Sequence, residues 1–214
     1  MLSTILQNPA ESFFYIIALV LAITIHEYAH AWASDYLGDP TPRQQGRLSI
    51  NPLRHLDPLG TIFLFVAGFG WGKPVITDIR NFSNPKIGYA ITSLAGPIAN
   101  LIMAYIFSLP VTICIILKYN TNQIPFLTFT ELAYSANVLL MVFNLLPIYP
   151  LDGSKLIMAF INNPTTMQNF MRYGPLVLIF LYLINQWIPI FSWTIVSLSV
   201  LTNFIIRGIF LQFF

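Results

Sequence analysis

The sequence predicts an all-α protein that crosses a membrane several times. Of its 214 residues, 56% are hydrophobic and only 8% are charged, and the mean hydropathy is +0.70, which lies far outside the range of soluble domains. Long apolar runs are separated by short polar loops. We therefore expect about five transmembrane helices in one membrane domain over residues 1–214, with a core at 12–161 and C-terminal helices at 173–214.

The first predicted span begins with the uncharged run Ser12–Ile25 and continues through the sequence HEYAHAWA. Together these segments reach the about 20 residues that a helix needs to cross a bilayer. The residues before Phe13 carry no Lys or Arg, and cleavage after the run would discard the end of this helix. We therefore expect a retained anchor and not a signal peptide.

Four more apolar stretches predict the remaining spans, at Ile87–Leu117, Leu132–Ile161, Pro175–Ile188 and Ile190–Ile206. Pro147 and Pro150 cannot both lie in an unbroken helix without removing backbone hydrogen bonds, so the third span is expected to be unwound just before Asp152. The last two stretches are short enough that one tilted span is an alternative. The segment Gly60–Ile79 is too short and glycine-rich to predict a further span, and it could be re-entrant or interfacial.

The positive charges are distributed very unevenly about these spans. By the positive-inside rule, the side that carries nine of the ten Lys and Arg residues is cytoplasmic, which predicts a multi-pass protein of the cell membrane with its N-terminus outside. The tenth, Lys118, falls on the other side. Because the cations are spread along loops and form no patch, we expect no nucleic-acid binding. The nine are Arg43, Arg47, Arg54, Lys73, Arg80, Lys86, Lys155, Arg172 and Arg207.

A metal-binding pattern, HExxH, occupies residues 26–30 near the end of the first predicted span. His26 and His30 are four apart and so share one helix face, where their imidazoles can converge on a zinc ion. Glu27 lies beside that face, where its carboxylate can take a proton from a metal-bound water. The motif could also be two ordinary surface histidines, but ionisable groups at membrane depth are retained only when paired, metal-bound or facing water.

A third ligand is needed for a catalytic zinc site, and Asp152 is the best candidate. It is the one carboxylate embedded in an apolar stretch apart from Glu27, and the predicted topology places it at the depth of His26 and His30, toward the cytoplasmic side. The alternative is a cap or turn residue in an Asp-Gly corner.

These motifs resemble those of the site-2 protease family, the intramembrane zinc metalloproteases, and most closely its compact branch without a PDZ domain. The resemblance rests on HExxH, on N-x-x-P-x-x-x-L-D-G from Asn144 to Gly153 and on A-G-P-x-x-N from Ala95 to Asn100, and it covers about Thr24–Ile157. It implies a three-helix catalytic core with one zinc ion (Zn²⁺) per chain.

Residue by residue, the resemblance implies that His26, His30 and Asp152 hold the zinc and that Glu27 activates the water. It also implies a catalytic role for Asn144, whose alternative is an ordinary interhelical hydrogen bond. Asn100 is expected to be structural, because Gly96 beside it predicts a close-packing notch against the motif helix.

The likeness further implies a short membrane-associated β element at residues 70–79, whose edge would accept an extended substrate. An interfacial loop anchored by Trp71 and Lys73 is the alternative.

Asn137 lies seven residues before Asn144 and could share its polar face.

The implied partners are a transmembrane protein substrate and the lipid bilayer, and a separate regulatory membrane protein is a further candidate because the Lys118–Glu131 connection is too short for a PDZ insertion. Two other functions stay open. A membrane metal transporter would be expected to show repeated half-sites and gives Glu27 no role. A catalytically inactive membrane scaffold would keep the metal for stability alone.

Overall fold

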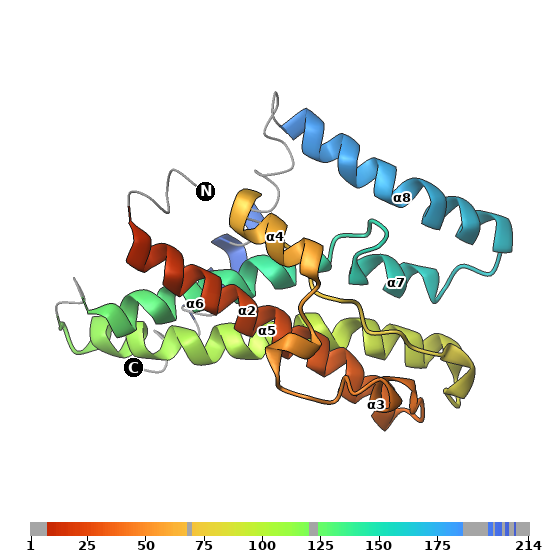
Figure 1. The fold of residues 1–214 in the computed structure, drawn as a ribbon, viewed down its shortest axis with the longest axis horizontal. Helices are drawn as coiled ribbons and strands as arrows, with labels where there is room; N and C mark the ends of the chain where they lie inside the picture. The colour runs from red at the N-terminus through yellow and green to blue at the C-terminus, as the bar shows by residue number, and fades with distance from the viewer. Residues whose placement is uncertain are drawn as a thin grey trace.

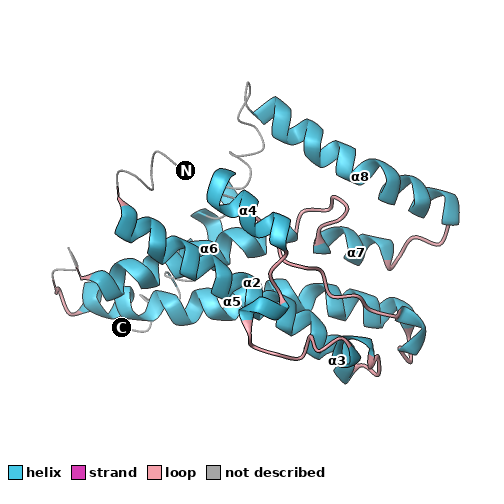
Figure 2. Cartoon of the chain, viewed as in Figure 1, coloured by secondary structure: helices cyan, strands magenta, loops and turns pink. Residues whose placement is uncertain are grey.

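The computed structural model describes residues 8–67, 70–119 and 124–185, together with a few isolated positions after residue 196. Helices joined by loops make up these described residues (Figure 2). In chain order the elements are α2 (Pro9–Tyr36), α3 (Thr41–Gln44), η1 (Pro52–Arg54), α4 (Pro58–Ala67), η2 (Ile79–Asn81), α5 (Pro85–Ile116), α6 (Pro125–Asn144), α7 (Asp152–Met158) and α8 (Pro164–Asn185).

Three helices of this described part, α2, α5 and α6, are long and apolar enough to cross a membrane. They pack against one another, with α2 and α6 running in one direction and α5 in the other (Figure 1). The first two predicted spans are confirmed as membrane-type helices. The third helix begins at Pro125, seven residues before the predicted start at Leu132.

Small residues bring α2 and α6 close together. Ala18 and Ala22 of α2 pack against Ala133 and Ala136 of α6, and all four are at most 1% exposed. Because lipid is as apolar as these side chains, close backbone approach and the van der Waals contact it allows drive such packing. The contact fixes the half of α2 that leads into the histidine motif.

The third predicted span is not one helix, since α6 ends at Asn144 and α7 begins only at Asp152. The predicted break before Asp152 is therefore confirmed, while the prediction of a span reaching Ile161 is wrong. Pro147 and Pro150 lie in the intervening turn, where their missing N–H groups cost no helical hydrogen bond. The turn delivers Asp152 to the start of a new helix.

Farther along the chain, α8 covers most of the fourth predicted span, Pro175–Ile188, but begins in polar residues at Pro164 and is not among the three membrane-type helices. The fifth, Ile190–Ile206, lies largely outside the described residues.

Between α2 and α5 the chain forms the short helix α4 and then an extended segment. The 10 residues of α4 measure about 15 Å, half the thickness of the hydrocarbon core. No strand forms among the described residues here. The predicted β element is reduced to one antiparallel bridge, Leu56 with Gly72, supported by a hydrogen bond of 2.6 Å from Lys73 N to His55 O.

The loop that leaves α2 is anchored by Asp39, whose side chain is fully buried. Its carboxylate accepts hydrogen bonds from Ser34 Oγ at 2.9 Å, from Thr41 N and Oγ1 at 3.1 and 2.6 Å, from Asp78 N at 2.8 Å and from Asn81 Nδ2 at 2.9 Å. One carboxylate thus ties the end of α2 to the segment that leads into α5.

Replacing Asp39 with asparagine should lower the free energy of unfolding by about 2 kcal/mol, because an NH₂ group would then face buried donors. Burial alone would raise the pKa of Asp39, but hydrogen bonds from Thr41 and Asn81 outweigh it and hold that pKa below the ordinary 3.8. A carboxylate with a lowered pKa stabilises the fold at pH values above its unfolded pKa and ceases to do so as the pH falls through the folded pKa. Thermal unfolding in detergent should therefore show a constant gap between wild type and variant from about pH 7 to 5 that narrows below about pH 4. Equal stability at neutral pH would contradict this role.

Candidate metal centre

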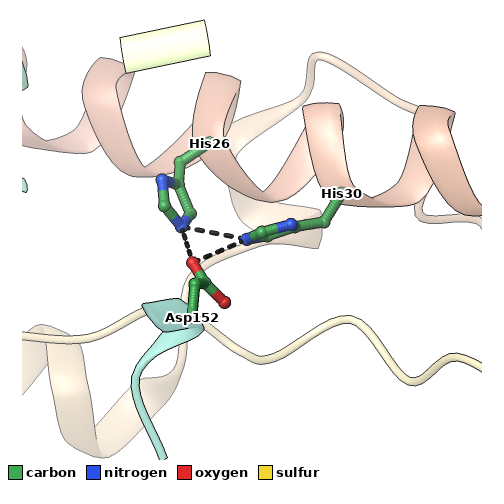
Figure 3. Close-up of side chains that lie close together, drawn as sticks. All are labelled: His26, His30 and Asp152. Carbon is green, nitrogen blue, oxygen red and sulfur yellow. Dashed lines mark hydrogen bonds and ion pairs between the residues drawn. The ribbon is translucent and has the colours of Figure 1, made fainter. Parts of the chain in front are cut away.

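Three potential metal ligands meet where α2 faces the start of α7. Figure 3 shows His26 and His30 pointing from α2 toward Asp152. The two Nε2 atoms are 3.0 Å apart, and they lie 2.9 Å (His26) and 3.0 Å (His30) from Asp152 Oδ2. All three residues are buried, at 4 to 5% exposure. A point about 1 Å out of the plane of this triangle is 2.0–2.1 Å from each atom, the bonding distance of zinc to nitrogen and oxygen ligands.

Hydrogen bonds on the far side of each imidazole decide which nitrogen faces the centre. His30 Nδ1 lies 2.7 Å from Thr92 O, which only accepts, so Nδ1 carries the proton. His26 Nδ1 lies 2.5 Å from Asn100 Oδ1. With their protons on Nδ1, the imidazoles turn both Nε2 lone pairs toward a carboxylate oxygen, and a metal cation bound between the three atoms would satisfy all of them. The donor set therefore fits zinc.

Gly96 of α5 lies directly against the two imidazoles. A Cβ built on this glycine would lie 2.5 Å from His30 Nε2, 2.6 Å from His26 Cε1 and 2.7 Å from His26 Nε2. These distances are too short for any side chain, so glycine is required for α5 to pass the ligand atoms. The predicted close-packing notch against the motif helix is confirmed, and it lies against the histidines themselves.

The second carboxylate oxygen of Asp152 accepts a hydrogen bond from a lysine one helical turn later in the chain. Lys155 Nζ donates to Asp152 Oδ1 at 2.8 Å, which leaves Oδ2 for the imidazoles. Lys155 is not among the site residues that the sequence predicts. Its spacing of three residues on a helix was the available signal, but only a helix that starts at Asp152 makes that spacing meaningful.

Glu27 lies beside the centre and is not one of the three converging ligands. Its Oε2 is 4.0 Å from Arg47 Nη2, and the two side chains are 14% and 4% exposed. The guanidinium of Arg47 also donates to the backbone oxygens of Arg54 and Lys73. This buried arginine, which sequence reasoning counted only as a loop cation, joins both arms of the loop that lies over Glu27.

Asn144, the last residue of α6, lines the same cavity as the three ligands. Its Nδ2 donates to Leu140 O at 3.0 Å, within its own helix. Asn100, by contrast, touches a ligand directly, so the expectation that it is merely structural is incomplete. Asn137 does not contact Asn144 in any hydrogen bond of the described residues and instead accepts one from Asn100 at 2.8 Å.

A cavity of about 400 Å³ opens beside the three ligands and Glu27. Its walls come from α2, α5, the end of α6, the start of α7 and the extended segment after α4. The lining residues are Ile23, His26, Glu27, His30, Gly70, Trp71, Gly72, Pro74, Val75, Thr77, Tyr89, Thr92, Ser93, Leu140, Phe143, Asn144, Pro150, Leu151, Asp152 and Lys155.

The chain is similar to proteins whose names describe zinc metalloproteases. Residues 108–184 match Peptidase family M50. YwhC of Bacillus subtilis, whose name describes a zinc metalloprotease, is 40% identical over 150 residues, which cover 67% of this chain and 67% of YwhC. Rip2 of Mycolicibacterium smegmatis, also named as a zinc metalloprotease, is 29% identical over 183 residues, covering 78% of this chain and 67% of Rip2. No solved structure matches.

Proposed function

The chain belongs to Peptidase family M50 and is an intramembrane metalloprotease, and we propose that it cuts transmembrane segments of substrate proteins with one zinc ion held by His26, His30 and Asp152. The observation that carries this proposal is the meeting of three buried ligand atoms from α2 and α7 beside a cavity among membrane-type helices. Ligands from two segments 122 residues apart in the chain do not converge by helix periodicity alone.

The side chains around the centre suit peptide hydrolysis. A zinc ion held there would act as a Lewis acid on the scissile carbonyl and make water more acidic. Glu27, free of the ligand set, takes the proton of the attacking water and passes it to the leaving amine. Asn144 at the cavity wall is the candidate donor to the developing oxyanion, for which its amide has a second N–H besides the one that bonds Leu140 O.

The substrate would enter as an extended segment. Trp71 to Thr77 form the loop side of the cavity and run without helix, so a substrate backbone can pair beside them as in β-strand addition. This is the role expected of the membrane-associated β element, which the substrate itself would complete. A helical peptide bond is shielded, and such pairing would expose it.

We further propose that the site faces the cytoplasm of a cell-membrane protein with its N-terminus outside. Supporting this, the loops with Arg43, Arg47, Arg54, Lys73 and Arg80 all lie between the C-terminal end of α2 and the N-terminal end of α5, the end of the bundle that carries the histidines. The comparisons support neither a metal transporter nor an inactive scaffold. We also propose that the protein has further transmembrane helices besides α2, α5 and α6, about five in all. A separate regulatory membrane protein is proposed as a partner.

Metal removal tests the proposed function. The purified chain in detergent should contain one zinc per chain, cleave a model transmembrane substrate, lose that activity when a chelator removes the zinc, and regain it when zinc is restored. Elemental analysis and gel-based cleavage assays give the two readouts. Undiminished cleavage by zinc-free protein would refute the metalloprotease centre, and zinc binding without cleavage of any helical substrate would favour the scaffold.

A further inference from the structure

The two histidines of the centre are oriented by different kinds of acceptor. His30 Nδ1 faces a backbone carbonyl, Thr92 O, which no substitution can remove. His26 Nδ1 faces a side chain, Asn100 Oδ1, at 2.5 Å. An amide side chain can present either its oxygen or its NH₂ group, so the orientation of His26 depends on what holds Asn100.

Asn100 is completely buried on α5 and its amide is fixed by two further hydrogen bonds. Its Nδ2 donates to Ala22 O of α2 at 3.2 Å and to Asn137 Oδ1 of α6 at 2.8 Å. A backbone carbonyl only accepts, so the contact with Ala22 O requires the NH₂ group on that side. The oxygen of Asn100 must then face His26.

Asn137 is fixed by the same logic. It is 1% exposed, and its Nδ2 donates to Ala133 O within α6 at 2.8 Å. This places Oδ1 of Asn137 toward Asn100. The direction of every hydrogen bond in the series is therefore set, from the α6 backbone through Asn137 and Asn100 to Nδ1 of His26.

We propose that Asn100 and Asn137 are positioning residues that hold His26 with its proton on Nδ1 and its Nε2 lone pair turned to the metal. This inference rests on the proposed zinc centre. With the NH₂ of Asn100 reversed, two donors would face each other, and His26 would have to move its proton to Nε2 and lose its ligand atom. Partners of this kind behind a ligating histidine raise metal affinity by about 10–100-fold.

A purely structural role makes a different prediction. Hydrogen bonds between membrane helices contribute about 0.6 kcal/mol on average, so a pair of asparagines could simply join α2, α5 and α6. Removing them would then lower the unfolding temperature and leave zinc affinity unchanged. The two roles are separated by measuring both quantities on the same variants.

The test is a competition of Zn²⁺ between a chelator of known affinity and the purified full chain in detergent. Asn100→Leu should weaken zinc binding by about 10–100-fold, and Asn100→Asp, which keeps an oxygen facing Nδ1, should bind at least about tenfold more tightly than Asn100→Leu. Asn137→Leu should cause a smaller loss that disappears when Asn100 is already leucine, because residues acting in series are not additive.

Thr130→Val is the matched control, since Thr130 is a buried polar residue of α6 whose hydroxyl bonds Leu127 O in the same helix. It should bind zinc as the wild type does. Unchanged zinc affinity in Asn100→Leu, or an equal loss from Asn137→Leu in both backgrounds, would overturn the inference. A wild-type chain that binds no zinc would instead refute the proposed function on which the inference rests.

Discussion

Replacing Glu27 with glutamine should leave one zinc per chain and lower the cleavage rate constant by about 10²–10⁴-fold, the usual contribution of a general acid–base group. Glu27 does not share in the converging ligand triad of His26, His30 and Asp152, so its removal should not release the metal. Glutamine keeps the size of the side chain but cannot take a proton from water. The loss should therefore fall on kcat.

The experiment measures zinc content and single-turnover cleavage of a helical substrate on the same preparation. Glu11→Gln is the matched control, because it is the same substitution on the same helix. Glu11 lies in the exposed first turn of α2. The control should cleave at the wild-type rate. A Glu27→Gln protein that cleaves normally would show that the proton acceptor lies elsewhere, and one that loses zinc would make Glu27 part of the metal-binding set.

The centre could be predicted from the sequence where its geometry depends on local spacing. His26 and His30 are four apart on a helix, and the two prolines before Asp152 predict the break in the helix that precedes it. Asp152 itself was indicated by its place in an apolar stretch at the predicted depth of the histidines. The structure brings these three together as expected. Helices α2 and α5 follow in the same way from the length of the apolar runs, whereas α6 begins before the third predicted span and ends at Asn144.

Contacts that depend on how one helix is rotated against another could not be predicted. Asn100 lies four residues after Gly96, on the same face of α5, and this face meets the histidines. The sequence predicts that Gly96 packs against the motif helix, but it does not show that Asn100 reaches Nδ1 of His26. The position of Arg47 could be predicted even less, because its side chain contacts the backbone of Arg54 and Lys73, and the loops that carry these three residues follow no periodic pattern.

The rotation of α5 leads to a second large effect, at Gly96. Alanine is preferred over glycine inside a helix by about 1 kcal/mol, so helix propensity alone would favour Gly96→Ala. A Cβ at this position, however, would lie 2.5 Å from Nε2 of His30 and 2.7 Å from Nε2 of His26. Either the imidazoles or the whole of α5 must move. We expect zinc affinity to fall by about 100-fold, the upper end of what changes around metal ligands cause, and cleavage to fall with it.

A clash of similar severity elsewhere on α5 separates crowding of the ligands from general damage. At Gly88 a Cβ would lie 2.5 Å from the ring of Phe82, a buried side chain outside the cavity. Gly88→Ala should therefore lower the unfolding temperature of the zinc-free chain while its zinc affinity stays at the wild-type value. In Gly96→Ala, by contrast, the main loss should be in zinc affinity, measured by chelator competition, and the unfolding temperature of the zinc-free chain should change less. If both variants bind zinc equally well, the space beside Gly96 is not what the metal needs, and the close passage of α5 serves helix packing alone.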